Sequence, residues 1–263
     1  MSEAPHEVEG VLLVRADDQE AAARKVAGLE AVDRFRLRHR PAQRIRDVYL
    51  DTGNGALAAA RVAFRVRELD GSPLLTLKAD PVRSGLAAQR LELEAPWSAA
   101  ALRMVLEELR RRGIDLPEAS EVAGAGEPLA DLAGLGLRPT QVRETTRTPR
   151  DVLEGDDAAA GPVAELTVDD VGYRLPAGTA RLLEVEVEAK GPGGMDTVNE
   201  LLEALAAAFP DDLAPWPYGK LATGRAVERL LADGRLEGLL DAAGRIRPAA
   251  HELLAEFLAE NSP

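Results

Sequence analysis

Cysteine is absent from the 263-residue sequence. This absence excludes disulfide bonds and thiolate metal sites, so a metal ion would have to be held by oxygen or histidine ligands. The three histidines, His6, His39 and His251, are too scattered along the chain to predict a shared site. Aspartate and glutamate are therefore the candidate metal ligands.

Basic residues are in deficit, because 32 lysines and arginines face 45 aspartates and glutamates, for a net charge of −13. Affinity for duplex nucleic acid comes largely from basic residues that meet phosphates, so this balance argues against a duplex as partner. A phosphate site would have to be a local group of cations within an acidic protein. Aromatic residues make up only 3% of the chain, and the core is therefore expected from leucine, valine and alanine.

Long apolar runs are also missing, and none approaches the roughly 20 residues that a membrane helix needs. Residues 1–9 lack the basic stretch and the apolar stretch of a signal peptide. We therefore expect no membrane partner and a cytoplasmic location.

Strands and helices are predicted in groups. Strands are expected over residues 6–14, 34–39, 44–50, 62–69, 74–79, 88–95, 140–147, 150–154, 163–171 and 181–189. Helices are expected over residues 17–32, 98–113, 195–209 and 218–233, with one or two more in 237–261, and residues 118–138 are expected to form a linker. Because helices do not alternate with single strands, this order predicts an α+β fold built on an antiparallel barrel, and not an α/β fold.

Charged residues recur at every second position of several predicted strands, which places them on one face of each strand. Some strand faces carry cations: Arg65 and Arg67 on one strand, Lys78 on the next, and Arg143 and Arg147 on a third. Other strand faces carry carboxylates: Glu7 and Glu9; Glu165 and Asp169; and Glu184, Glu186 and Glu188. One further strand has a mixed face, with Arg90, Glu92 and Glu94. Taken singly, each strand fits an ordinary solvated face. The signs are nevertheless segregated by strand, which would also suit the lumen of a barrel.

A charged lumen is costly unless its charges are paired or bound to ligands. Arginine, lysine and glutamate could simply neutralise one another. A triphosphate with a metal ion would satisfy both sets at once, because arginine offers planar donors to phosphate oxygens and carboxylates suit Mg²⁺ or Mn²⁺.

The motifs resemble, in their order, those of the CYTH domain of the triphosphate tunnel metalloenzyme superfamily. They are EVE (7–9), DVYLDT (47–52), FRVRE (64–68), LTLK (75–78), RLELE (90–94), RETTR (143–147), ELTVDD (165–170), LLEVEVE (182–188) and GKLATG (219–224). The resemblance covers roughly residues 6–232. It implies an antiparallel eight-stranded β-barrel with flanking helices, in a tunnel domain over 1–233 followed by a C-terminal helical extension over 234–263. The extension is expected either to close one end of the barrel or to contact a second copy in a homodimer.

The resemblance also implies metal-dependent hydrolysis of a triphosphate group, in inorganic triphosphate or a nucleoside triphosphate. The implied metal ligands, for Mg²⁺ or Mn²⁺, are Glu7, Glu9, Asp169, Glu184 and Glu186. The implied phosphate-binding residues are Arg65, Arg67, Lys78, Arg90, Arg143, Arg147 and Lys220. Of these, Glu7, Glu9, Arg65 and Lys78 are expected to be catalytic.

Two positions depart from the family pattern. Val11 stands where the opening ExExK motif has lysine, and Gly219 stands where serine often precedes the lysine. The missing cation leaves open a module that binds triphosphate or polyphosphate without turnover. Adenylate cyclase is a second alternative, and thiamine triphosphatase a third, less favoured because aromatic residues that could stack on the thiazolium are scarce.

Two further groups are expected to be structural. Tyr49 and Asp51 precede a predicted turn and are expected to serve that turn and not to contact substrate. A basic run is expected to form a solvated strand with salt bridges to acidic neighbours, the alternative being a basic lining of the tunnel mouth or a surface that recruits polyphosphate. It consists of Arg34, Arg36, Arg38, Arg40, Arg44 and Arg46.

Overall fold

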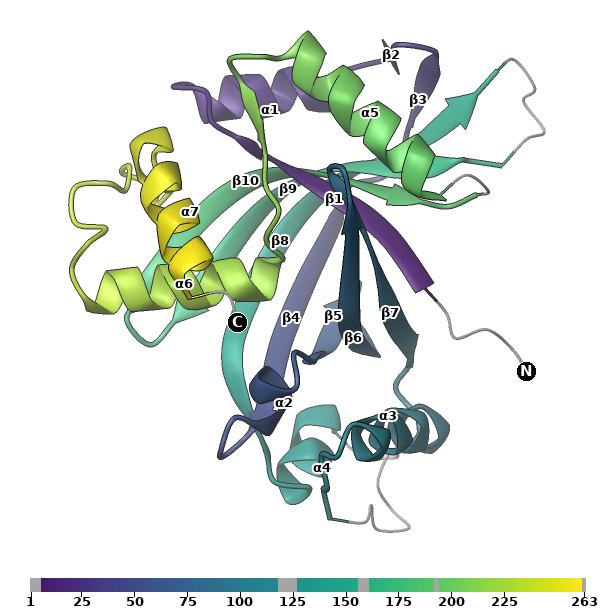
Figure 1. Ribbon diagram of the computed structural model, residues 1–263, viewed down its shortest axis with the longest axis vertical. Helices are drawn as coiled ribbons and strands as arrows, with labels where there is room; N and C mark the ends of the chain where they lie inside the picture. The colour runs from purple at the N-terminus through teal and green to yellow at the C-terminus, as the bar shows by residue number, and fades with distance from the viewer. Residues whose placement is uncertain (1–5, 118–126, 156–160, 192–193, 262–263) are drawn as a thin grey trace. The chain divides into compact units, whose positions relative to one another are not determined.

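The structure is a computed structural model that describes residues 6–117, 127–155, 161–191 and 194–261 (Figure 1). The chain divides into two compact units. The first unit holds Met1–His6, Ile45–Pro81 and Arg90–Arg143, and the second holds Glu7–Arg44, Val82–Gln89 and Glu144–Pro263. The divisions fall inside strands, so β6 (Ser72–Ser84), β7 (Ala87–Pro96) and β8 (Leu137–Glu154) each contribute to both units.

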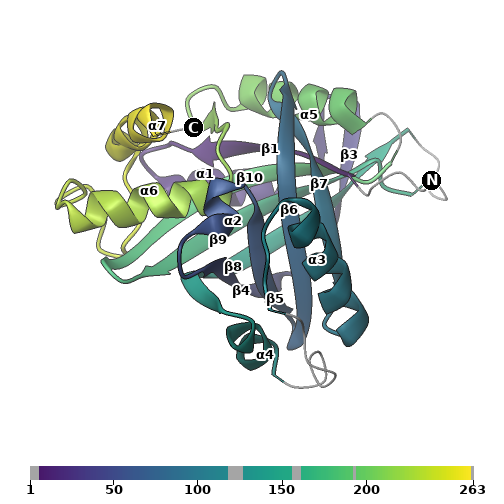
Figure 2. The same cartoon turned by 60° about the horizontal axis from the view of Figure 1, so that its bottom comes forward.

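The first unit is an antiparallel sheet with helices on one face. Its strands follow the order β8-β4-β5-β6-β7, with β4 at Gln43–Thr52 and β5 at Ala63–Leu69. Helices α2 (Ala56–Ala59), α3 (Ala99–Arg111) and α4 (Pro128–Gly134) belong to it, and Figure 2 shows α3 beside β6 and β7. Leu102, Val105 and Leu109 of α3 pack with Phe64 and Leu77 in its apolar core.

The second unit contains the strands of the predicted carboxylate faces. Strands β3 (Phe35–His39), β8, β9 (Ala164–Leu175), β10 (Gly178–Ala189) and β1 (His6–Val14) are neighbours in this order, with the short β2 (Ala31–Val32) on β3 and β11 (Leu213–Pro215) on β1. Helices α1 (Gln19–Ala27) and α5 (Gly194–Ala208) cover an apolar face that includes Leu166, Val185 and Val187.

Helices α6 (Lys220–Ala232) and α7 (His251–Glu260), with the turn η1 (Pro248–Ala250) before α7, complete the second unit. Leu254 and Leu258 of α7 share a core with Val227 and Leu230 of α6. The segment between these helices is tied to the sheet, because the Arg181 amide donates to the Gly244 carbonyl and the Ile246 amide donates to the Arg181 carbonyl, both at 2.9 Å. Residues 234–261 therefore pack on this unit.

Several predicted elements have different bounds in the structure. The helix predicted over 17–32 ends at Ala27, because the Gly28 amide closes it on the Arg24 and Lys25 carbonyls and the chain then enters β2. The two strands predicted over 140–154 are one strand, β8, in which Pro149 is tolerated and its carbonyl accepts from Arg40. Part of the predicted linker, 118–126, lies outside the described residues. None of the described helices combines the length and apolar character that a membrane crossing requires.

Candidate functional site

Three arginines of the first unit converge on one aspartate. Arg67 donates to both carboxylate oxygens of Asp47, at 2.8 and 3.2 Å. Arg143 Nη2 donates to Asp47 Oδ2 at 3.0 Å, and Arg65 Nε lies 3.5 Å from Asp47 Oδ1. Asp47 and Tyr49 share a face of β4, and the register sets them opposite Arg67 and Arg65 of β5. We call these five residues the arginine cluster.

Tyr49 is the second anchor of the arginine cluster. Its hydroxyl oxygen accepts a hydrogen bond from Arg65 Nη1 at 3.0 Å and a second, short one from Arg143 Nη2. The Arg143 guanidinium also lies over the ring, 4.4 Å from its centroid. The Tyr49 hydroxyl bonds to arginines of β5 and β8, so its assignment to the chemistry of the following turn was wrong.

The arginine cluster is buried and carries excess positive charge. Arg143 is fully buried, and Asp47 and Arg65 are nearly so. Burial alone would raise the pKa of Asp47, but the three guanidinium groups hold it far below its usual range. Burial would likewise raise the pKa of Tyr49, but Arg143 and Arg65 together lower it. Three permanent cations therefore face one carboxylate.

The other predicted cations of the first unit lie on β6 and β7. Lys78 Nζ is 3.1 Å from Glu92 Oε1 of β7. Glu94 accepts from the Thr76 hydroxyl at 2.8 Å and lies 4.0 Å from Arg65 Nη2. Arg90 is half-buried on β7. The mixed face of β7 thus supplies carboxylates that pair with the cations of β5 and β6.

Carboxylates predominate in the second unit. A buried set, which we call the carboxylate cluster, comes from β1, β9 and β10 and consists of Glu7, Glu9, Glu165, Asp169, Glu184 and Glu186. Strand register brings its members side by side: Glu184 lies opposite Asp169, and Glu9 and Glu165 flank Glu188 of β10, which lies next to the cluster. The predicted metal ligands therefore share one face of three adjacent strands.

Two cations that were predicted to bind phosphate lie among these carboxylates. Lys220, at the first position of α6, places Nζ 3.1 Å from Glu184 Oε2 and 3.4 Å from Asp169 Oδ2, and it also donates to Glu186. Arg147 of β8 holds Asp169 with two hydrogen bonds, at 2.9 and 2.7 Å, and reaches Glu186 Oε1 at 3.0 Å. Their contacts in the second unit are thus with predicted metal ligands.

Burial and charge shift the pKa values in this cluster in opposite directions. Burial would lower the pKa of Lys220, but Glu186, Glu184 and Asp169 raise it well above its usual value. Burial raises the pKa of Glu184 even against Lys220. Burial also raises the pKa of Glu188 to about 7, although Lys190 opposes the shift. Within the cluster, the six carboxylates outnumber the two cations.

The charged face of β1 ends at Val11. Val11 lies opposite Glu186, but its side chain is buried in an apolar core with Leu13, Tyr173 and Trp216. The Trp216 amide also donates to the Val11 carbonyl at 2.8 Å. Where the family pattern has a lysine, this chain therefore continues its apolar core.

Comparison with known proteins identifies the family. The CYTH domain family matches residues 6–209, most of the chain. The chain belongs to the CYTH family. Lys220 lies beyond the matched residues. No curated protein matches the sequence.

The chain is also similar to solved structures. The protein HpAC1 from Hippeastrum, described as having a dominant triphosphatase activity, superposes with a TM-score of 0.52 at 19% identity, covering 84% of this chain and 96% of that one. A Pyrococcus horikoshii protein gives 0.45 at 17% identity, covering 86% and 99%, and the mimivirus capping enzyme triphosphatase gives 0.41 at 11% identity, covering 78% and 90%. The first likeness confirms the predicted fold class, an α+β fold with an antiparallel eight-stranded β-barrel and flanking helices.

A divalent metal of the kind that CYTH triphosphatases use suits the donors of the carboxylate cluster. They are hard oxygen ligands, which Mg²⁺ and Mn²⁺ prefer. Both carboxylate oxygens of Glu184 are buried and, within the described residues, neither has a hydrogen bond of regular geometry, although Lys220 Nζ lies 3.1 Å from Oε2. Among the described residues, no three carboxylate or histidine groups converge on a common metal position. The Lys220 ammonium instead lies where Glu184, Glu186 and Asp169 come together.

The remaining expectations concern structural residues. Asp51 accepts from the Leu57 and Ala58 amides at the start of α2, so its structural role is confirmed. The expected salt bridges of the basic run are confirmed for three of its arginines: Arg34 pairs with Glu154 and Glu200, Arg38 with Asp151, and Arg40 with Asp151 and Glu165. Arg36 donates to the Gly155 carbonyl.

Asp47 was not among the predicted site residues. The available signal was its place two residues before Tyr49, on the face of β4 that meets Arg65 and Arg67. A buried acid opposite an arginine-rich strand is a candidate anchor for those arginines.

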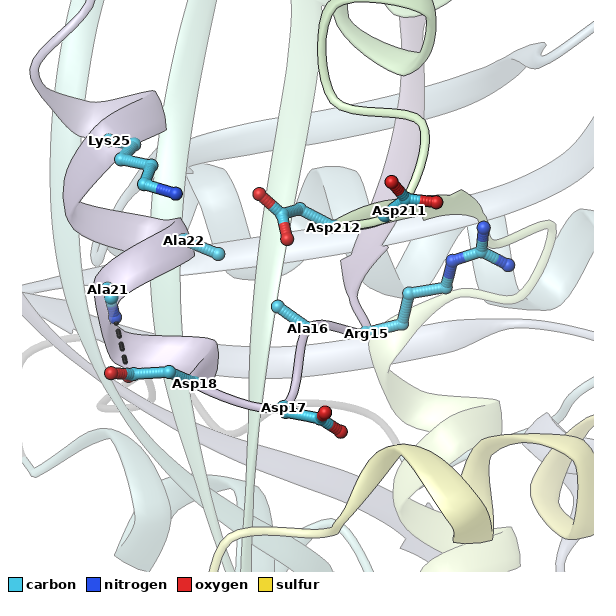
Figure 3. A pocket seen from close by; sticks show the side chains of 9 residues that line it. All are labelled: Arg15, Ala16, Asp17, Asp18, Ala21, Ala22, Lys25, Asp211 and Asp212. Atoms are coloured by element: carbon cyan, nitrogen blue, oxygen red, sulfur yellow. Dashed lines mark hydrogen bonds between the residues drawn. The ribbon is translucent and has the colours of Figure 1, made fainter.

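A separate pocket of about 380 Å³ lies in the second unit and contains none of the predicted site residues (Figure 3). Its polar groups are Arg15, Asp17, Asp18, Lys25, Asp211 and Asp212. Asp18 caps α1 by accepting from the Ala21 amide, and Arg15 donates to the Pro210 carbonyl. These contacts give Asp18 and Arg15 roles in local structure.

Proposed function

We propose that this CYTH protein hydrolyses a triphosphate group, in inorganic triphosphate or a nucleoside triphosphate, with Mg²⁺ or Mn²⁺. The observation that carries the proposal is the charge character of the two clusters. The first unit gathers three guanidinium groups on one carboxylate. The second gathers four carboxylates around Lys220 and Arg147, namely Glu165, Asp169, Glu184 and Glu186. The positive charge of the arginine cluster suits phosphate oxygens, and the negative charge of the carboxylate cluster suits a divalent cation.

In this proposal the arginine cluster binds phosphate oxygens. Each guanidinium has five donors in a planar fork, so Arg65, Arg67 and Arg143 keep donors for a ligand while they hold Asp47. Groups fixed in advance stabilise the charge of phosphoryl transfer without reorganising during the reaction. Lys78 adds a further cation in the same unit.

The carboxylate cluster would hold the metal in this proposal. Asp169, Glu184 and Glu186 are the central ligands, with Glu7 and Glu9 beside them on β1. When bound, a divalent metal supplies Lewis acidity and lowers the pKa of water in its coordination shell. Ion pairing holds the side chains of Asp169 and Glu186 in place through Arg147.

An assay with several substrates tests the proposal. The protein is incubated with inorganic triphosphate, ATP and thiamine triphosphate, each with Mg²⁺, Mn²⁺ or EDTA, and phosphate, pyrophosphate and cyclic AMP are measured. We expect metal-dependent release of phosphate that Glu184→Gln abolishes and that the exposed control Glu256→Gln retains. Absence of turnover of all three substrates with either metal would refute hydrolysis.

The second candidate is a module that binds triphosphate or polyphosphate without turnover. Two observations favour it: Val11 removes an expected cation, and the Lys220 ammonium lies among the predicted metal ligands. This candidate predicts binding in calorimetry without product with any metal. Cyclic AMP and pyrophosphate from ATP would instead identify an adenylate cyclase.

The proposal also covers the location of the protein, its domain bounds and its oligomeric state. We propose a cytoplasmic location, and a tunnel domain over 1–233 followed by a helical extension over 234–263, whose helix α7 packs on α6. A homodimer has little apolar surface to use, because Val82 is the one large hydrophobic side chain exposed among the described residues. Size-exclusion chromatography with light scattering tests the oligomeric state.

A further inference from the structure

Arg150 of β8 is a buried cation without an ion pair. It is 1% exposed, and its Nε and Nη1 atoms are buried without a hydrogen-bond partner. Among the described residues, no carboxylate lies within 4 Å of its guanidinium, whereas every other buried arginine has one. These pairs are Arg65 and Arg143 with Asp47, Arg147 with Asp169, and Arg245 with Glu20. A buried charge that nothing compensates is costly, so this arginine calls for an explanation.

The charge of Arg150 is permanent, because a guanidinium stays protonated at any physiological pH. Burial lowers the pKa of Arg150, and the charge of Glu30 opposes this shift without cancelling it. Glu30 is an exposed residue of the segment that joins α1 to β2. Arg150 therefore keeps its positive charge and lacks a close counter-charge.

The register of β3 and β8 places Arg150 on the face that carries the apolar core shared with α1. Leu37 lies opposite Val152, and both belong to this core. His39 lies opposite Arg150 on the same face, because side chains two apart on a strand share a face. Arg147, three residues before Arg150, lies on the other face, in the carboxylate cluster. His39 is exposed, so the face of Arg150 meets solvent on the neighbouring strand.

We propose that Arg150 and His39 form a binding site for a small oxyanion such as phosphate, separate from the proposed triphosphate site. The Arg150 guanidinium supplies planar donors that match two oxygens of a phosphate. The imidazole of His39 has an N–H donor whether it is neutral or protonated, and it adds this donor from the adjacent strand. The anion enters from the exposed side of His39, and Glu30 competes with it for the guanidinium.

Four substitutions separate the parts of this site. Arg150→Met keeps a long apolar stem but removes the charge and the donors. His39→Ala removes the second donor, and Glu30→Gln removes the competing carboxylate. Arg235→Met, at an exposed position after α6, is the matched control for the loss of an arginine. All four positions lie outside the arginine cluster and the carboxylate cluster.

The test measures binding of inorganic phosphate by isothermal titration calorimetry in EDTA. We expect Arg150→Met to weaken binding about tenfold or more, because it removes a hydrogen-bonded charge from the anion. His39→Ala should weaken binding about twofold or more, and Glu30→Gln should strengthen it about twofold to fivefold. Arg235→Met should bind like the wild type. Phosphate at the arginine cluster contributes equally to every protein compared, since none of the substitutions changes that cluster.

Thermal unfolding distinguishes a ligand-binding arginine from a structural one. Without phosphate, Arg150→Met should unfold at a higher temperature than the wild type, because an uncompensated buried charge has been removed. Phosphate should then stabilise the wild type more than the variant. If Arg150 serves only the fold, Arg150→Met will unfold at a lower temperature, and phosphate will stabilise both proteins equally.

The Nε–H group of Arg150 supplies a reading specific to this site. Because Nε is buried, its hydrogen should exchange slowly enough to give a signal in ¹⁵N–¹H spectra, and the signal that Arg150→Lys lacks belongs to Arg150. We expect phosphate to shift this signal. Equal affinity of the wild type and Arg150→Met for phosphate, or an Nε–H signal that phosphate leaves unmoved, overturns the site. Either result leaves the proposed hydrolysis intact, because turnover of triphosphate is assayed separately.

Discussion

The Lys220 ammonium lies 3.1 Å from Glu184 Oε2, inside the group of carboxylates that the sequence motifs assign to a metal. In the first unit the relation is reversed, and a single acid, Asp47, lies inside a group of arginines. Each cluster therefore contains a minority charge of opposite sign. Removing that charge should cost stability, and a bound ligand of the same sign should restore it.

Lys220→Gln tests this relation in the second unit. Breaking a buried ion pair by removing one partner costs about 3–5 kcal/mol, because the remaining carboxylates are left uncompensated. We expect a lower free energy of unfolding in EDTA and a larger stabilisation by Mn²⁺ than in the wild type, measured by thermal unfolding. Lys25→Gln, on the exposed face of α1, is the control. Equal stability of Lys220→Gln and wild type in EDTA would contradict the expectation.

Arg65→Ala should weaken triphosphate binding more than it slows the chemical step. It removes one guanidinium from Tyr49 and from Asp47, and the expected rise in KM is tenfold or more. Arg65→Lys should recover only part of the affinity, because lysine lacks the planar fork. Steady-state kinetics measure both variants, and Arg38→Ala, whose salt bridge with Asp151 lies elsewhere, serves as the control. An unchanged KM in Arg65→Ala would remove Arg65 from the binding group.

Glu188 predicts a pH dependence of stability. Burial raises its pKa from 4.5 to about 7, so the folded state binds more protons than the unfolded state between these values. Stability contributed by protonated Glu188 is therefore present below about pH 4.5 and is lost as the pH rises through 7. Glu188→Gln should gain about 1–3 kcal/mol relative to the wild type between pH 5 and 8. Urea unfolding across this range measures the difference, and a gap independent of pH would show that Glu188 has no raised pKa.

Val11→Lys should not increase turnover. The family lysine would be introduced into an apolar core beside Trp216, and Lys220 already pairs with Glu186, the residue opposite Val11. We expect a loss of about 1–3 kcal/mol in the free energy of unfolding, whereas Val11→Met should cost less. A rise in kcat at unchanged stability would place position 11 in the substrate site.

Much of this fold could be predicted from local sequence, because strand faces follow a period of two residues. The strand from His6 to Val14 has the predicted bounds, and the alternation of Glu184, Glu186 and Glu188 correctly indicated a shared face. Ser98 and Gly113 likewise bound α3, through a side-chain cap and a residue with positive φ. These features depend on neighbours in the sequence.

Contacts that depend on distant elements could not be predicted. Nothing near Lys220 in the sequence shows that the start of α6 meets Asp169 and Glu184 of the sheet. Nothing near Asp47 shows that Arg143, 96 residues later, shares it with Arg67. Val11 continues the alternation of its strand, and only the packing of Trp216 and α6 explains why an apolar side chain belongs there.

The packing of α7 on α6 has a consequence for the order of folding. The residues that cover α6, Leu254 and Leu258, are synthesised after it, as is Ile246, whose carbonyl accepts from Gln19 of α1 at 2.9 Å. Synthesis proceeds from the N-terminus, so the β-strands with the carboxylates leave the ribosome before α6, which brings Lys220, and before α7, which covers α6. A nascent chain at that stage would expose a concentrated patch of negative charge, and free divalent cations would be its readiest counterions.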